Sequence, residues 1–126
     1  MVQCQFFYQY ECKSQNSDAC SVAGKWSDGW LVFVDVNDNA SRDLGEETLQ
    51  VRPAIKGQVS LRGNFMVRNY VGYDADGMAR TSGGAFQMGT IVTCDDRGLG
   101  SGKAIVINSA GRIRTVRAVK TSFTSC

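Results

Sequence analysis

Short apolar stretches recur along the chain at the length and spacing of β-strands. The run from Trp30 to Val34 is short and continuously apolar, whereas residues 59–62 alternate between apolar and polar. The same criteria predict further strands in Phe6–Cys12, Leu49–Ile55, Phe65–Tyr73, Ala85–Cys94 and Ala104–Ile107. Clusters of Asn, Asp, Gly and Ser separate these segments, as turns require. No eleven-residue window has an apolar face with helical periodicity, so the pattern predicts a mainly β fold of antiparallel sheets.

The composition supports a folded protein of ordinary size. The chain has 126 residues, of which 43% are hydrophobic and 21% charged, as in soluble globular proteins. This length predicts a single domain over residues 1–126. No apolar run approaches the ~18–20 residues that cross a bilayer as a helix.

Five cysteines and the absence of histidine favour disulfides over a zinc site. Cys12 and Cys20 flank a polar loop that a local bridge would close, and a Cys94–Cys126 bridge would fix the end of the chain. Cys4 is then left over. We therefore expect an oxidising compartment and a tethered C-terminal segment.

Positive charge is concentrated toward the C-terminus. Residues 1–60 hold five Lys and Arg against eight Asp and Glu, whereas residues 61–126 hold nine against four. From Arg97 onward there are six basic residues and no acidic one. Such a one-sided distribution predicts a polyanion or an acidic protein surface as the partner.

The chain lacks the usual catalytic arrangements. Without histidine, Ser–His and Cys–His nucleophile activation is excluded. The glycine-rich segment Gly98–Lys103 has no following helix to bind a phosphate, so we interpret it as a strand connection. We do not expect an enzyme.

One segment has the spacing of a calcium loop. Asp35, Asn37 and Asn39 are followed by Glu46 at the twelfth position. Ala40 stands where such loops have glycine, and the flanks resemble strands rather than helices. We therefore favour a hairpin whose Asp and Asn side chains cap their own turns, with calcium as the alternative and no other cofactor or metal expected.

Several sequence features together resemble the soluble domain of GspH/FimT-type minor pilins. They are the Cys12/Cys20 pair, the run Trp26-x-x-Gly29-Trp30-Leu31-Val32-Phe33-Val34-Asp35, the sequence Asp43-x-Gly45-Glu46, and an ending with Gly111-Arg112-Ile113-Arg114 before a late cysteine. The resemblance covers roughly residues 12–126 and implies a pilin-type α+β fold whose N-terminal hydrophobic helix is absent from this sequence. It also implies contact with other pilins and with the membrane through that helix, and a location in a pilus at the cell envelope.

The family resemblance implies two alternative functions. FimT-like members bind DNA in natural transformation through a C-terminal Gly-Arg-x-Arg motif, and we favour this function for the chain. FimU-like and GspH-like members are structural subunits near the tip of a pilus or secretion pseudopilus.

The motif also has a physical rationale of its own. On an extended segment, Arg112 and Arg114 point to the same side about 6.6 Å apart, so that two guanidinium groups can contact neighbouring phosphates. Gly111 permits the turn that presents them or a close backbone approach to the ligand, and Ile113 is expected to anchor the segment on the core. The alternative is a solvated edge strand whose arginines discourage aggregation.

The surrounding basic residues extend the candidate DNA-binding site. Continued alternation places Lys120 on the side of Arg112 and Arg114, and Arg117 on the side of Ile113 unless the strand bulges. Lys103 is the expected helper from a neighbouring segment. Few aromatics interleave with these residues and no recognition helix is predicted, so we expect sequence-independent binding to the backbone of duplex DNA. Trp26 and Trp30 are interpreted as packing residues, as are Phe6, Phe7 and Tyr8.

Overall fold

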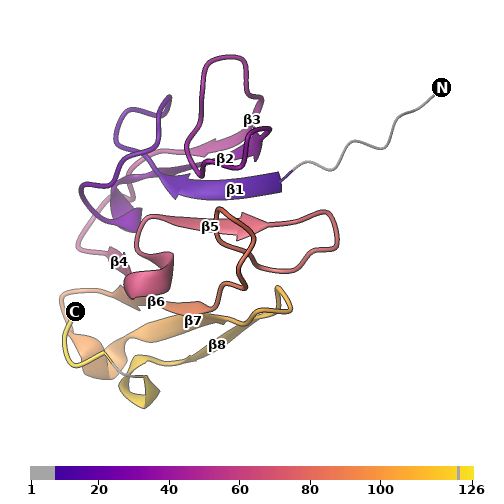
Figure 1. Cartoon of the computed structure of the whole chain (residues 1–126). Coiled ribbons are helices and arrows are strands. Elements are labelled where there is room, and N and C mark those ends of the chain that lie inside the picture. The colour runs from indigo at the N-terminus through magenta and orange to yellow at the C-terminus, as the bar shows by residue number, and fades with distance from the viewer. Residues whose placement is uncertain (1–7, 122) are drawn as a thin grey trace.

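The computed structural model describes residues 8–121 and 123–126, which form two four-stranded antiparallel sheets (Figure 1). The strand order is β3-β2-β1-β5 in the first sheet and β4-β6-β7-β8 in the second. The strands are β1 (Tyr8–Lys13), β2 (Trp30–Asp35), β3 (Thr48–Arg52), β4 (Ser60–Gly63), β5 (Tyr70–Tyr73), β6 (Gly89–Cys94), β7 (Lys103–Ile107) and β8 (Ile113–Arg117). Short 3-10 turns occur at η1 (Trp26–Asp28), η2 (Phe65–Val67), η3 (Leu99–Ser101) and η4 (Ala118–Lys120). The expected mainly β, antiparallel architecture is confirmed.

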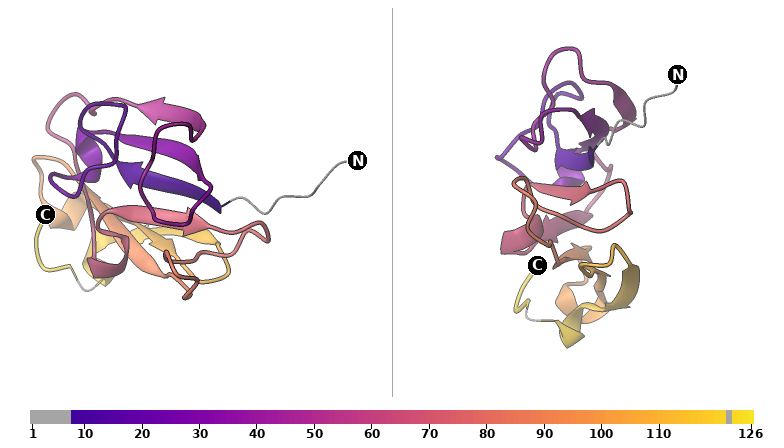
Figure 2. Two further views of the ribbon diagram at one scale, coloured as in Figure 1. Left: turned by 45° about the horizontal axis from the view of Figure 1, so that its top comes forward. Right: turned by 45° about the vertical axis from the view of Figure 1, so that its right-hand side comes forward.

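One core cluster lies where the two sheets meet. The first sheet forms the upper half of Figure 1 and the second the lower half, and both views of Figure 2 keep this division. The buried members of this cluster are Trp26, Val67, Val71, Ala79 and Ile107. Trp26 is a packing residue, as expected, and its indole Nε1–H donates to the Val67 carbonyl at 2.9 Å.

The side of the first sheet that faces away from the second is covered by loops. Tyr10, Leu31 and Phe33 form a second buried cluster there, against which Cys20 and Ala40 pack. The Cys12–Cys20 disulfide joins β1 to the covering loop. β2 therefore has buried side chains on both faces.

The outer side of the second sheet is covered by the end of the chain. Val92, Cys94, Ala104 and Ala118 form a third cluster, with Phe123 packed against it. The Cys94–Cys126 disulfide fixes this segment to β6, so the expected tether of the C-terminus is confirmed.

Some expected strands are shorter in the structure. β3 ends at Arg52, directly before Pro53, which has no N–H to donate to a sheet. The prediction for Phe65–Tyr73 is wrong in its first half, because the chain turns through η2 as it passes between the sheets, and β5 begins only at Tyr70.

The prediction for Ala85–Cys94 extends too far toward the N-terminus, because β6 begins at Gly89. Gln87 is fully buried, and its side-chain amide forms hydrogen bonds with the backbone of nearby residues. Its amide donates to Met66 and Tyr70 carbonyls at 2.8 and 3.0 Å and accepts the Gly72 N–H at 2.9 Å.

Cys4, Phe6 and Phe7 lie outside the described residues, as does the side chain of Tyr8. Among the residues that are described, none belongs to a helix long and apolar enough to cross a membrane.

Candidate nucleic-acid interface

The Gly-Arg-x-Arg motif lies in a hairpin formed by β7, β8 and the turn at residues 108–111, here named the arginine hairpin. Val106 lies opposite Arg114 and Ile107 opposite Ile113 in the antiparallel register. Asn108 closes the turn, because its backbone N–H donates to the Arg112 carbonyl and its side chain accepts the Arg112 N–H at 3.0 Å. The sequence analysis missed Asn108, although Asn is a common turn residue that bonds to its own backbone.

Gly111 is required by the geometry of this turn. Its φ of 78° lies in the left-handed region, and an added Cβ would collide with the Gly77 carbonyl oxygen. The Ala79 N–H also donates to the Ser109 carbonyl at 3.1 Å, so the turn is held against the connection between β5 and β6. The glycine of the motif thus serves a close backbone approach within the protein.

Arg112 and Arg114 are both exposed and lie at alternate positions of the extended chain. With Val106, Asn108 and Ile113 they border a hollow of about 440 Å³. The strand rise places their Cα atoms about 6.6 Å apart. Neither guanidinium lies within ion-pair distance of a carboxylate among the described residues. Two unneutralised arginines therefore face solvent on one side of a hairpin anchored at its turn.

Ile113 points to the other side of β8, as expected, but it does not anchor the strand by burial. Its side chain remains 60% exposed at the edge of an apolar groove of about 170 Å³, which Trp30, Tyr73 and Ile105 also line. The expected anchoring role is instead carried by the turn and by the backbone pairing with β7.

Lys103 and Arg117 lie directly opposite each other in the hairpin register. Strand alternation places both on the face opposite Arg114. The expected separation of Arg117 from the arginine pair agrees with this register. Lys103 was expected to assist Arg112 and Arg114 from a neighbouring segment, and the register puts it on the other face, beside Arg117.

Lys120 does not follow the expected alternation. β8 ends at Arg117, and the Ala118 N–H then donates to the Gly102 carbonyl at 3.0 Å as the chain enters η4. The premise that placed Lys120 on the arginine side is therefore wrong, although its side chain is exposed. Arg97 is also unavailable as a free cation, because it pairs with Asp95 at 2.7 Å, and its hydrogen bonds lower the pKa of that carboxyl.

The loop with calcium-like spacing is held by a network of hydrogen bonds. Asp35 is fully buried and accepts the Ala40 N–H at 2.7 Å, while the Glu46 carboxylate accepts the Val36 and Asp43 N–H groups. The amides of Asn37 and Asn39 both donate to Asp43. Burial, followed by the charge of nearby Glu46, raises the pKa of Asp35. These contacts are those of a side-chain-capped loop.

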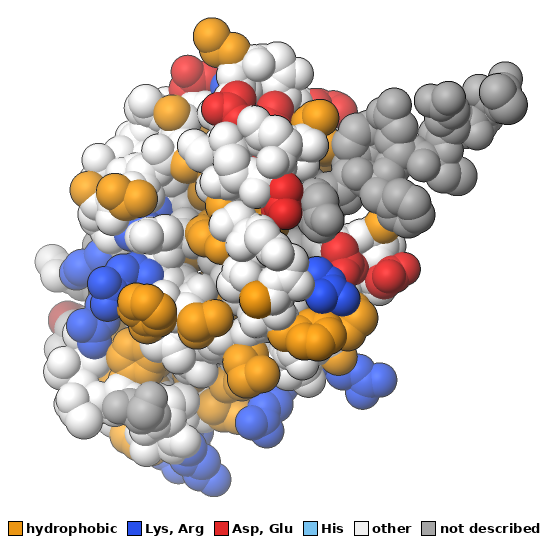
Figure 3. Space-filling model, in the orientation of Figure 1, with side chains coloured by type: hydrophobic (Ala, Val, Ile, Leu, Met, Phe, Trp, Pro, Cys, Tyr) orange, Lys and Arg blue, Asp and Glu red, His pale blue; other side chains and the backbone are white. Residues whose placement is uncertain are grey.

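The distribution of charge over the surface follows the two sheets. On the face in Figure 3, most acidic side chains lie in the upper half, and most basic ones lie in the middle and lower parts. Besides the arginine hairpin, the structure brings together Lys13, Lys25, Arg62 and Arg68 around one pocket. The sequence analysis missed this cluster, because its members come from four separate segments and form no local motif.

Comparison with known proteins places the chain in a family. The profile described as type II transport protein GspH matches residues 12–111, so the match ends just before Arg112. No curated protein sequence gives a significant match. Two crystal structures of the type IV minor pilin FimU from Pseudomonas aeruginosa are similar in fold, with TM-scores of 0.64 and 0.61 at 15% sequence identity. Both matches cover 94% of this chain, and 76% and 80% of the FimU chains respectively. With a match over most of its length and a fold shared with a minor pilin, this chain belongs to the GspH family.

Proposed function

We propose that this GspH-family chain is the exposed domain of a minor type IV pilin that binds the backbone of duplex DNA through Arg112 and Arg114, as a step in DNA uptake during natural transformation. The observation that carries the proposal is the pair Arg112 and Arg114, exposed on one side of the arginine hairpin. Among the described residues, neither arginine has a carboxylate partner. A guanidinium presents paired N–H donors that match phosphate oxygens. Two disulfides are consistent with a location outside the cytoplasm, in a pilus at the cell envelope.

The geometry favours contacts with phosphates over contacts with bases. The described residues contain only short 3-10 turns as helical elements, and none resembles a recognition helix for the major groove. The hollow beside the two arginines is lined by Val106, Asn108 and Ile113, so it offers no aromatic surface for base stacking. Binding is therefore sequence-independent and weakens with salt.

The salt dependence follows from the number of phosphates contacted. Since Lys103 and Arg117 lie on the opposite face, the arginine pair by itself neutralises about two phosphates. Two phosphates correspond to a slope of log K against log salt of about −1.8. Any steeper slope would report basic residues beyond the pair.

A mobility-shift assay with a matched control tests the proposal. Arg112→Ala and Arg114→Ala should each weaken binding to a short duplex roughly tenfold, since a hydrogen bond to a charged group contributes about 1.5 kcal/mol. The Arg112→Ala/Arg114→Ala double variant should then lose most of the affinity. The Lys103→Ala/Arg117→Ala variant removes the same charge from the other face of the same hairpin. This variant should retain most of the DNA affinity.

Two results would contradict the assignment. If the double variant at positions 112 and 114 binds duplex DNA as well as the unaltered protein, the arginine pair is excluded as the DNA-binding site. Equal losses in both double variants would mean that only net charge matters. An unlabelled single strand added as competitor distinguishes duplex from single-strand preference.

The alternative is a structural minor pilin or pseudopilin subunit without DNA affinity. The observation favouring it is that the family match ends at residue 111, before either arginine of the motif. The arginine hairpin would then face an acidic neighbouring subunit. Changes at positions 112 and 114 would impair pilus assembly, while the isolated protein would give no DNA shift at moderate salt.

A further inference from the structure

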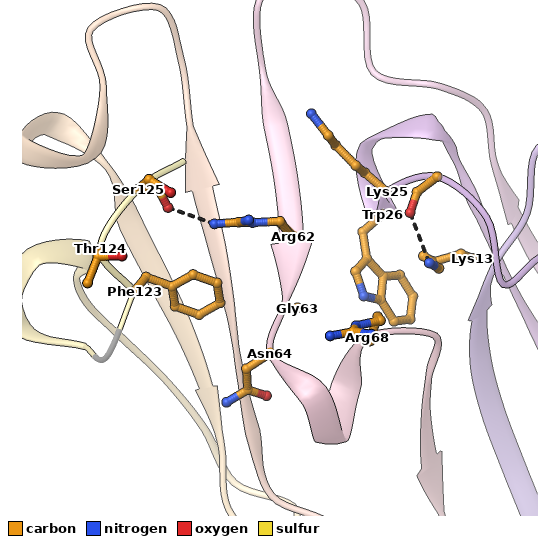
Figure 4. A pocket seen from close by; sticks show the side chains of 11 residues that line it. Lys13, Lys25, Trp26, Arg62, Gly63, Asn64, Arg68, Phe123, Thr124 and Ser125 are labelled. Atoms are coloured by element: carbon orange, nitrogen blue, oxygen red, sulfur yellow. Dashed lines mark hydrogen bonds between the residues drawn. The ribbon is translucent and has the colours of Figure 1, made fainter.

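A pocket of about 530 Å³ lies beside the junction of the two sheets, away from the arginine hairpin. Lys13, Lys25, Arg62 and Arg68 line it, together with residues 123–125 of the C-terminal segment, and we call it the basic pocket (Figure 4). In the close-up, Lys13, Lys25 and Arg68 lie on the side of Trp26, while Arg62 extends from β4 toward the C-terminal segment. No acidic residue is among the described residues that line the basic pocket.

Two of the four cations are held in place by contacts within the protein. Lys13 is only 2% exposed, and its Nζ donates to the carbonyls of Val22 and Gly24 at 3.3 and 2.9 Å. Since an ammonium group has three donors, these two bonds leave one. The guanidinium of Arg62 lies 5.3 Å from the centre of the Phe123 ring and donates to the Ser125 carbonyl at 2.7 Å. These contacts fix both side chains before any ligand arrives.

Arg62 also has an unsatisfied donor. Its Nε is buried and has no hydrogen-bond partner. A buried N–H without an acceptor is costly, and an anion satisfies this donor only if the Arg62 side chain shifts, because the Nε atom is closed to solvent. None of the four cations of the basic pocket lies within ion-pair distance of a carboxylate among the described residues.

The cations also act on one another. Burial lowers the pKa of Lys13, and the positive charge of Arg68 lowers it further. Asp28 opposes this effect in part, although its carboxylate is already engaged with the Lys25 backbone N–H at 2.8 Å. Like charges that are only partly compensated around a hollow favour the binding of an anion.

We propose that the basic pocket binds a phosphate group, free or carried on a small organic molecule. Arginine is the preferred residue for oxyanions, because its planar group donates two parallel hydrogen bonds, and here two arginines are joined by two lysines. The pocket is larger than a single phosphate, so it has room for the group that carries the phosphate. This site is separate from the arginine hairpin and does not depend on the function proposed for it.

The C-terminal disulfide contributes to the basic pocket. Phe123 and Ser125 position Arg62, and the Cys94–Cys126 bridge fixes the segment that contains them. β4 and β8 are the two edge strands of the second sheet, so three strand spacings place the backbones of Arg62 and Arg114 about 14 Å apart or more across the sheet. A small phosphate compound therefore cannot occupy both sites at once.

Titration with inorganic phosphate at constant ionic strength, followed by ¹H–¹⁵N NMR, tests the proposal. We expect saturable shifts at the amides of Lys25, Asn64 and Ser125. The Arg62→Gln/Arg68→Gln variant should bind phosphate at least roughly tenfold more weakly. The Lys103→Gln/Arg117→Gln variant loses the same charge elsewhere, at two exposed positions, and should change phosphate affinity less than about twofold. Equal weakening in both variants, or shifts that do not saturate, would overturn the proposal.

Further experiments provide a test in case the variant does not fold, and they identify the chemical class of the ligand. If the Arg62/Arg68 variant is unfolded by its NMR spectrum, Lys25→Gln provides the test, because this exposed side chain can be neutralised without disturbing the core. An unchanged phosphate affinity in Lys25→Gln would then contradict the proposal. Acetate that produces the same saturable shifts would overturn it in favour of a carboxylate ligand. Glucose 6-phosphate binding more tightly than inorganic phosphate, with glucose alone inactive, would support an organic phosphate; equal binding would support free phosphate.

Discussion

The two disulfides close loops of very different length, and this difference predicts their contributions to stability. Cys12–Cys20 spans 8 residues and Cys94–Cys126 spans 32. In the chain-entropy model, a disulfide stabilises by restricting the unfolded state, and the effect grows with the logarithm of the loop length. These lengths correspond to about 2.5 and about 3.7 kcal/mol at 25 °C. For a domain whose total stability is about 5–15 kcal/mol, the longer bridge is a substantial fraction.

Matched serine variants isolate the two contributions. Cys20→Ser and Cys126→Ser each break one bridge at its more exposed end, leaving the buried sulfurs of Cys12 and Cys94 in place. A shared Cys4→Ser background prevents exchange with the remaining cysteine. Urea unfolding followed by circular dichroism gives the free energy of unfolding of each variant. We expect Cys126→Ser to lose about 1 kcal/mol more than Cys20→Ser.

The Cys94–Cys126 bridge also maintains contacts in the folded protein, which the loop-entropy model does not include. Breaking the Cys94–Cys126 bridge releases the segment that holds Phe123 and Ser125 against Arg62, so the loss for Cys126→Ser should exceed the entropic value. A Cys20→Ser variant as destabilised as Cys126→Ser, or more so, would refute this reasoning. It would mean that local packing around the short loop matters more than loop length.

Two further predictions concern single positions in the first sheet. Burial raises the pKa of Glu11 above its ordinary value of 4.5. The folded protein therefore retains a proton at a pH where the unfolded chain has released it. The free energy of unfolding should then fall as the pH rises above 4.5 and through the folded-state pKa of Glu11. Glu11→Gln should therefore raise the melting temperature at pH 7 and flatten its pH dependence, whereas the exposed control Glu47→Gln should change neither; equal behaviour of the two variants would contradict this account. Gly72→Ala should cost about 3 kcal/mol in urea unfolding, because an added Cβ would overlap the fully buried Tyr10 ring and the Arg80 carbonyl. Gly100→Ala has open space around its Cβ and should cost less than about 0.5 kcal/mol, and a similar cost at both positions would refute the steric explanation.

The alternation of side chains determined much of the fold and part of the candidate DNA-binding site. It separated Arg117 from Arg112 and Arg114, while the continuous apolar run at residues 30–34 located β2. The separation of the arginines follows from the two-residue period of a strand, which is a local property of the backbone. The reasoning failed at η2, where the predicted strand has not yet begun, and at η4, where β8 has ended, because a short 3-10 turn has no sequence pattern strong enough to interrupt an apparent alternation.

The sequence by itself thus determined the strand-rich architecture, the concentration of positive charge after Arg97 and the pairing of Arg112 with Arg114 on one side. Only the tertiary structure placed Lys103 on the opposite face, and only it brought Lys13, Lys25, Arg62 and Arg68 around one pocket. The physical reason is the range of the interactions involved. Strand periodicity acts between neighbours in the chain, whereas the basic pocket depends on how two sheets and a disulfide-bonded C-terminus meet in space.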